Sequence, residues 1–243
     1  MKSLREVADC VGIEGAFHVA RDFFGYITGP PQEISVRRQI RLIMHQHHVM
    51  INAILVASES FGDAEKREID GAVAFMRDTL ATVNFGIGPV RWFHIQTDDA
   101  DGHEHIANDA EAKDLTHEWR VDNEAIDVFF VLTYAGSTIG YAPRKGTENK
   151  NATHKMTGVV MAIEGSPTDT GFVLAREVCR YMGLKDSDNE NNLMFPTVPN
   201  GGNLTWEQRD DLVPSTNNWT PFVQIPCRWW DLDKNLTGGL ARW

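Results

Sequence analysis

The feature that most constrains the fold of this chain is an apolar run from Ala125 to Tyr134, AIDVFFVLTY. Its length and its content of β-branched and aromatic residues predict a buried β-strand. Val90 to Ile95 and Thr157 to Ile163 are expected to be strands as well. Apolar stripes at helical spacing predict long helices over about 63–85 and 171–182. Helices that pack against strands in this order predict an α+β fold with a three-layer α/β plan.

The N-terminal part, residues 1–60, is expected to form a helical extension to a main domain over residues 61–243. Apolar residues recur at spacings of three and four between Ile34 and Ser60, which predicts a helix there. The acidic stretch from Asp98 to Glu118 instead indicates a solvated loop with a short helix. The extension could cover the main domain or assemble with a second copy, and the sequence does not decide between these roles.

The chain is acidic, with a formal net charge of -11. It has no long cluster of Lys and Arg, so nucleic acid is not expected as a partner. Charged residues interrupt the N-terminus, and no apolar run approaches the roughly 18 residues of a membrane span. We therefore expect no membrane partner, and either a cytoplasmic location or export by a route other than the Sec pathway. The three cysteines lie far apart in the sequence, which suits a reducing compartment.

The most informative segment runs from Thr170 to Thr197, TGFVLAREVCRYMGLKDSDNENNLMFPT. Its first half predicts a helix that ends at Gly183, and its second half predicts a polar loop that closes on an apolar turn around Met194. The segment resembles the metzincin zinc proteases, whose signature is His-Glu-x-x-His-x-x-Gly-x-x-His or Asp, followed by a turn that contains methionine. The corresponding run here is Arg176-Glu177-Val178-Cys179-Arg180-Tyr181-Met182-Gly183-Leu184-Lys185-Asp186.

The resemblance implies a zincin-like fold in which a long helix and two strands precede the site helix. It also implies that Glu177 matches the general base, Asp186 the third zinc ligand and Met194 the Met-turn. Arg176 and Arg180 stand where the first two histidine ligands would be. The segment therefore matches the metzincin site at the general base, the third ligand and the Met-turn, but not at the first two zinc ligands.

Arginine at these two positions does not support zinc chemistry. A guanidinium group has five donors and no acceptor, stays charged in proteins and repels a metal cation. We therefore predict no bound metal and no cofactor. Two arrangements remain open: Arg176 and Arg180 occupy the place of the zinc and pair with Glu177, Asp186 or nearby carboxylates, or both side chains point to solvent along an exposed groove.

The favoured function is that of a catalytically inactive metalloprotease-like protein, with Glu177 as a vestigial general base, which binds a protein partner or forms a homo-oligomer. One alternative is an active zinc metallopeptidase that binds zinc through Asp186 and histidines outside the motif, such as His154 or His117, with Glu177 as general base. Another is an assembly protein whose resemblance to the proteases is accidental.

Two clusters of histidines are candidates for separate metal sites. His45, His47 and His48 belong to the helix predicted from Ile34, and His103 and His105 belong to the acidic loop. Neither cluster has the spacing of a known metal site. We interpret the first as partly buried or interfacial helix residues and the second as solvated loop residues.

Overall fold

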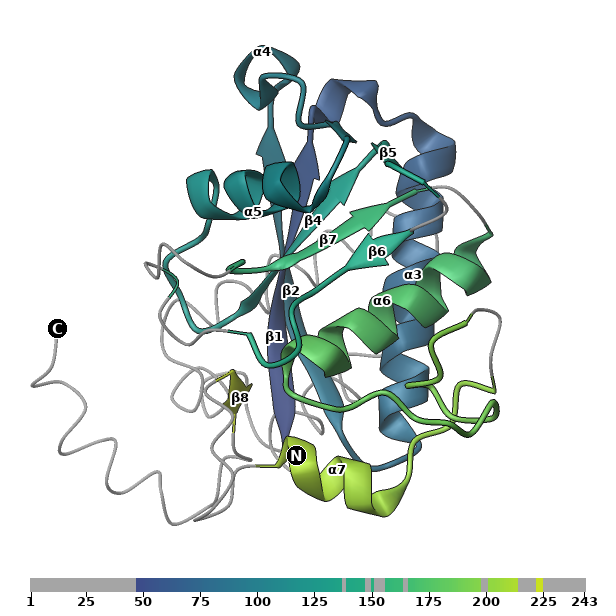
Figure 1. Cartoon of the computed structure of the whole chain (residues 1–243). Coiled ribbons are helices and arrows are strands. Elements are labelled where there is room, and N and C mark those ends of the chain that lie inside the picture. The colour runs from purple at the N-terminus through teal and green to yellow at the C-terminus, as the bar shows by residue number, and fades with distance from the viewer. Residues whose placement is uncertain are drawn as a thin grey trace, which may run out of the picture.

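The computed structural model describes residues 47–136, 139–146, 150, 156–163, 166–197, 201–213 and 222–224. Helices and strands alternate along most of this part of the chain (Figure 1). In chain order they are β1 (His48–Val56), the 3-10 helix η1 (Ser58–Ser60), α3 (Asp63–Ala81), β2 (Gly86–Ile95), α4 (Thr97–Ala100), β3 (His105–Ile106), α5 (Asp109–Glu118), β4 (Ile126–Val131), β5 (Thr133–Tyr134), β6 (Gly140–Tyr141), β7 (Val159–Ala162), α6 (Pro167–Tyr181), α7 (Trp206–Leu212) and β8 (Val223–Gln224).

The main sheet has the strand order β2-β1-β4-β7-β6, and β8 pairs with β1 outside this path. Strands β2, β1, β4 and β7 run parallel, whereas the edge strand β6 is antiparallel to β7. In the register of the two central strands, Asn52 lies opposite Asp127. Strands β3 and β5 form a separate parallel pair.

The sheet lies between two helical layers, which gives the three-layer α+β architecture predicted from the sequence (Figure 1). Alternate residues of a strand point to opposite faces of a sheet. On β1, Ile51 and Leu55 therefore join the core beneath α3 and α6, while Ile54 and Val56 join the core beneath α5. Burial on both faces accounts for the continuous apolar character of β1, β4 and β7.

Helices α3 and α6 lie side by side on one face of the sheet and approach closely (Figure 1). A Cβ atom added at Gly171 of α6 would lie 2.7 Å from the Cβ of Phe75 on α3. The rings of Phe75 and Phe172 contact each other at a tilt of 56°, with their centroids 4.4 Å apart. The absence of a side chain at Gly171 thus lets α3 fix the position of the helix that carries the candidate site.

The helix predicted from Ile34 to Ser60 is wrong where the structure describes it. His48–Val56 is a strand at the centre of the sheet, so the proposed boundary between a helical extension and a main domain at residue 60 is also wrong. The reason is that His48–Val56 is apolar at nearly every position, and such a run satisfies the helical spacing and the strand pattern equally well. The rest of the extension, residues 1–46, lies outside the described residues, and so does the first part of the helix predicted from Ile34.

The remaining elements follow the sequence prediction closely. The predicted strands correspond to β2, β4 and β7, and the predicted long helices correspond to α3 and α6. The stretch from Asp98 to Glu118 is more ordered than expected, because it contains α4, β3 and α5. None of the helices in the described part of the chain is long and apolar enough to cross a membrane.

Candidate functional site

Helix α6 presents the candidate site on a partly exposed side. Its N-terminus is capped by Ser166, whose Oγ accepts a hydrogen bond from the backbone N–H of Asp169 at 3.2 Å. Leu174 and Val178 bury the opposite side of the helix in the core. Arg176 and Arg180, one helical turn apart, are left at the edge of this core.

The chain reverses sharply at the end of α6. Gly183 has φ +115°, a conformation that side chains with a Cβ rarely adopt. The N–H of Gly183 donates to the carbonyl of Arg180 at 2.9 Å, and the N–H of Leu184 donates to the carbonyl of Cys179 at 3.0 Å. The predicted stop of the helix at Gly183 is therefore confirmed, and the turn brings Asp186 back beside the helix.

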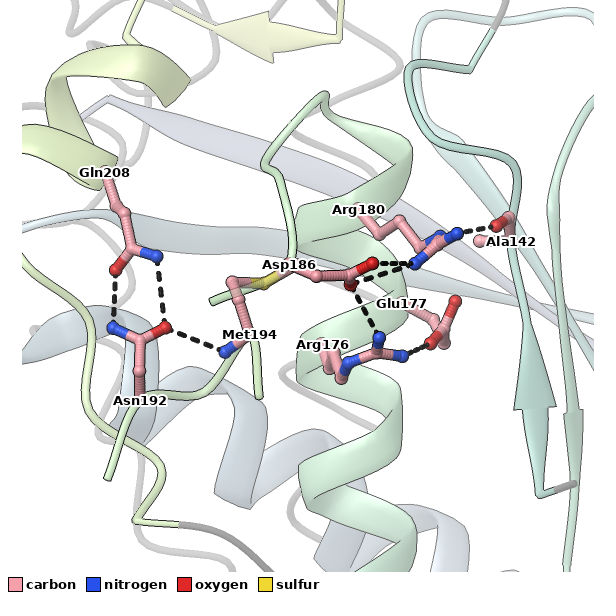
Figure 2. Close-up of polar contacts among 8 residues, drawn as sticks. All are labelled: Ala142, Arg176, Glu177, Arg180, Asp186, Asn192, Met194 and Gln208. Carbon is pink, nitrogen blue, oxygen red and sulfur yellow. Dashed lines mark hydrogen bonds and ion pairs between the residues drawn. The ribbon is translucent and has the colours of Figure 1, made fainter. Parts of the chain in front are cut away.

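The loop after this turn is held in place by Met194 and its neighbours. The N–H of Ser187 donates to the carbonyl of Met194 at 3.0 Å, and the N–H of Met194 donates to Oδ1 of Asn192 at 2.9 Å. Asn192 and Gln208 of α7 exchange two side-chain hydrogen bonds, of 2.8 and 3.0 Å. Because Met194 is fully buried, it anchors the loop that carries Asp186 in the core. The contacts of Asn192 with Met194 and Gln208 connect the same loop to α7 (Figure 2).

The two arginines of α6 meet on one carboxylate. Nη2 of Arg176 donates to Oδ1 of Asp186 at 2.7 Å, and Nη1 of Arg180 donates to Oδ1 and Oδ2 of Asp186 at 3.0 and 3.1 Å (Figure 2). Nη1 of Arg176 also donates to Oε1 of Glu177. Nε of Arg180 donates to the carbonyl of Ala142, just after β6, at 3.2 Å. Of the two predicted arrangements, the structure shows the one in which the arginines pair with Glu177 and Asp186.

The four side chains differ strongly in their exposure to water. The side chains of Glu177 and Arg176 are 4% and 13% exposed, whereas those of Arg180 and Asp186 are 27% and 44% exposed. Nε of Arg176 is buried and has no hydrogen-bond partner among the described residues. The cluster thus has a dry side at Glu177 and a wet side at Asp186.

Burial raises the pKa of Glu177 to about 7, although the positive charges of Arg176 and Arg180 act in the opposite direction. Near neutral pH the Glu177 carboxyl group is therefore divided between its protonated and ionised forms. With Glu177 protonated, two guanidinium groups face the single negative charge of Asp186. The cluster then keeps an excess positive charge within an acidic chain.

The cluster does not fit a zinc ion. The described residues contain no group of three His, Cys, Asp or Glu side chains that could hold a metal. His117 lies on α5, which packs on the face of the sheet opposite α6, so the structure does not bring it to Asp186 (Figure 1). His154, the other histidine of the alternative zinc site, lies outside the described residues.

The structure changes the placement of the first histidine cluster, part of which lies outside the described residues. In the second cluster it places His105 on a short strand. His48 begins the central strand β1 and is buried, so it does not lie on a helix with His45, which is outside the described residues. His105 lies on the short strand β3, where its Nδ1 is 2.9 Å from Oγ1 of Thr133.

Two contacts that hold the site in place were not predicted from the sequence. The carbonyl of Ala142 holds Arg180, but a backbone carbonyl leaves no signal in the residue type. Gln208 belongs to a capping box with Thr205 at the start of α7, and this Thr-x-x-Gln spacing is a signal that could have located the helix. Its second role, the pair of hydrogen bonds to Asn192, depends on the tertiary structure.

Comparison with known proteins leaves the family of this chain open. No family model and no curated protein sequence matches it. Among solved structures, it is similar to metalloproteinase-II from Bacteroides fragilis, with 12% identity, a TM-score of 0.42, and coverage of 63% of this chain and 47% of that one. It is also similar to a chain in the structure of a chaperone-substrate complex, with 12% identity, a TM-score of 0.37, and coverage of 60% and 25%.

The alignments span less than half the length of either matched structure. Likenesses this weak carry no weight for function.

Proposed function

We propose that this chain is a catalytically inactive metalloprotease-like protein in which two arginines have replaced the zinc ion. The observation that supports this proposal is the meeting of Arg176 and Arg180 on Asp186. In the metzincin resemblance these three positions are the zinc ligands, and here their side chains converge on one point. The guanidinium groups supply positive charge at that point, where the ion would have supplied it.

The residues that remain cannot perform metal-assisted hydrolysis by themselves. A zinc site lowers the pKa of a bound water to about 7 and polarises the scissile carbonyl, and a guanidinium group cannot coordinate that water as a metal does. Glu177 keeps the position and the raised pKa of a general base. However, its carboxylate is bonded to Arg176, and arginine at two of the ligand positions would not hold the zinc that presents a water to this base.

The loop supports the same proposal. Asp186 and Met194 are joined through Ser187, whose N–H bonds to the carbonyl of Met194. Burial of Met194 beside this connection is what a Met-turn that supports the ligand loop would require. We therefore assign the turn around Met194 as the Met-turn of the proposed ancestral site.

Without hydrolysis, the proposed role is binding, to a protein partner or to further copies of the chain. The net charge of -11 disfavours nucleic acid as the partner. Size-exclusion chromatography with light scattering tests the second possibility directly, because a homo-oligomer has a multiple of the monomer mass of 27.3 kDa.

Metal content separates this proposal from an active enzyme. Protein purified without a metal-affinity tag is incubated with zinc, dialysed and analysed by elemental mass spectrometry, and the wild type is expected to retain none. The variant Arg176→His/Arg180→His is expected to hold close to one zinc per chain, because it places two imidazoles beside Asp186. Asp186→Asn in that variant is expected to weaken the binding again.

The outcomes of these measurements distinguish an inactive protein from an active zinc peptidase. Stoichiometric zinc in the wild type, with cleavage of a peptide that is abolished by a chelator and by Glu177→Ala, would establish the active metallopeptidase. Failure of the double-histidine variant to bind zinc, while it remains folded, would show that positions 176, 180 and 186 are not a former metal site.

A further inference from the structure

A second polar cluster lies in the core on the other face of the sheet, away from α6. Asn52 of β1 and Asp127 of β4 are opposite each other on neighbouring strands, and both are 0% exposed. Lys150 reaches the same place and is 5% exposed. Their strand neighbours Ile54 and Phe129 belong to the apolar core beneath α5. A lysine this deeply buried is uncommon, and the proposed function makes no use of it.

One oxygen of the carboxylate contacts two nitrogen atoms. Oδ1 of Asp127 accepts hydrogen bonds from Nζ of Lys150 at 2.9 Å and from Nδ2 of Asn52 at 2.6 Å. The carbonyl of Val121 also accepts from Nζ, at 2.7 Å, and holds the amine on its other side. The amine and the side-chain amide are therefore gathered around a single proton acceptor.

The amide carbonyl of Asn52 is polarised by another residue. Nδ2 of Asn123 donates to Oδ1 of Asn52 at 3.2 Å, and Nδ2 of Asn52 donates to Oδ1 of Asn123 at 2.8 Å. The backbone N–H of Ala125 fixes Asn123 by donating to Oδ1 of its side chain at 2.9 Å. A fixed donor at Oδ1 stabilises the negative charge that develops there when a nucleophile attacks Cγ.

The apolar surroundings favour the uncharged forms of the pair. Burial raises the pKa of Asp127 and lowers the pKa of Lys150, while the attraction between the two groups opposes both shifts. Transfer of one proton from Nζ to Oδ1 gives a free amine beside a carboxylic acid. A free amine is the nucleophilic form of lysine.

We propose that Lys150 and Asn52 form an intramolecular isopeptide bond, with Asp127 as the general acid and base. The amine of Lys150 attacks Cγ of Asn52, and the carboxyl group of Asp127 gives a proton to Nδ2 and takes the second proton from Nζ. The Nζ–Cγ bond forms, the Cγ–Nδ2 bond breaks, and ammonia leaves. The exchange of one amide for another requires no oxidant, reductant or cofactor.

The geometry assigns a role to each member of the cluster. Asp127 touches both the attacking nitrogen and the leaving nitrogen, which is the position that proton transfer between them requires. The product joins the central strand β1 to residue 150, which follows the edge strand β6 in the chain.

The intact mass of the denatured full-length protein tests the proposal. The wild type is expected to be lighter than its sequence mass by about 17 Da, the mass of ammonia. Trypsin is expected not to cut after Lys150, and a branched peptide joining residues 52 and 150 is expected in the digest. The wild-type measurement needs no variant, so it does not depend on whether a substituted chain folds.

A matched pair of variants assigns the bond. Lys150→Met is expected to have its full sequence mass, whereas Lys66→Met, at an exposed position on α3, is expected to keep the deficit of about 17 Da. A wild-type mass equal to the sequence mass would overturn the proposal. A deficit of about 18 Da, from loss of water, would place the bond on Asp127 and overturn the assignment to Asn52.

Discussion

Replacing Glu177 by Gln is expected to change how the stability of the protein depends on pH. The pKa of this carboxyl group is raised by burial from 4.5 to about 7, so the folded state binds the proton more tightly than the unfolded state. The contribution of Glu177 to stability is therefore fully present below about pH 4.5 and is lost as the pH rises toward 7. A glutamine side chain resembles the protonated form and has no proton to lose.

The size of the effect follows from the two pKa values. Each tenfold change in proton affinity corresponds to about 1.4 kcal/mol, so the shift from 4.5 to about 7 corresponds to roughly 3 kcal/mol at most. The wild type is expected to lose about this much stability from Glu177 between about pH 4.5 and pH 8. The stability of Glu177→Gln relative to the wild type is expected to rise by the same amount over that range.

Urea unfolding followed by tryptophan fluorescence at the two pH values measures this difference. Glu118→Gln, at the exposed end of α5, is the matched control, since it removes one carboxylate without a buried environment. A difference between variant and wild type that does not change with pH would refute the assignment of a raised pKa. A relative loss of stability by Glu177→Gln at high pH would show that the charges of Arg176 and Arg180 outweigh the cost of burial.

Three further substitutions test other parts of the site. Asp186→Asn removes the negative charge shared by two guanidinium groups, so urea unfolding is expected to show a free energy of unfolding lower by about 1 to 2 kcal/mol. The control Asp210→Asn on α7 is expected to show no measurable loss, and equal losses in the two variants would contradict the pairing. Gly183→Ala forces a residue with a Cβ atom into φ +115°, which is expected to cost roughly 1 to 3 kcal/mol of stability and to lower the melting temperature of the protein accordingly. An unchanged melting temperature would mean that the turn relaxes. Gln208→Ala removes the Gln208 side-chain half of the α7 capping box and both hydrogen bonds to Asn192, so hydrogen exchange of the Met194 amide is expected to accelerate. Unchanged protection of that amide would show that α7 does not hold the loop.

Much of the fold could be predicted from local patterns, because most elements carry a pattern that only one secondary structure satisfies. Helix α3 has one apolar stripe with polar residues around it, and β4 is short and rich in β-branched and aromatic residues. Strand β1 was not predicted because HVMINAILV is apolar almost throughout, which fits a helix as well as a strand. Its secondary structure depends on the two strands that flank it. Tertiary pairing decided the structure there.

The candidate site divides in a similar way. Arg176, Glu177, Arg180 and Asp186 could be brought together from the sequence because they lie within one helix and the turn that follows it. The contact of Arg180 with Ala142 and the contact of Asn192 with Gln208 join segments that are distant in the chain. The geometry of the sheet and the packing of α7 create these contacts, and no local spacing records them.

The antiparallel pairing of β8 with β1 sets an order for the completion of the sheet during synthesis. Val223 and Gln224 lie opposite Val49 and His48, at the start of the central strand, where β4 does not reach. On a ribosome, β1, β2 and β4 emerge well before β8, so the first residues of β1 lack this neighbour until residue 224 has left the exit tunnel. A nascent chain that stalls earlier therefore has β1 paired with β2 and β4 but lacks the β8 pairing that completes the start of the strand.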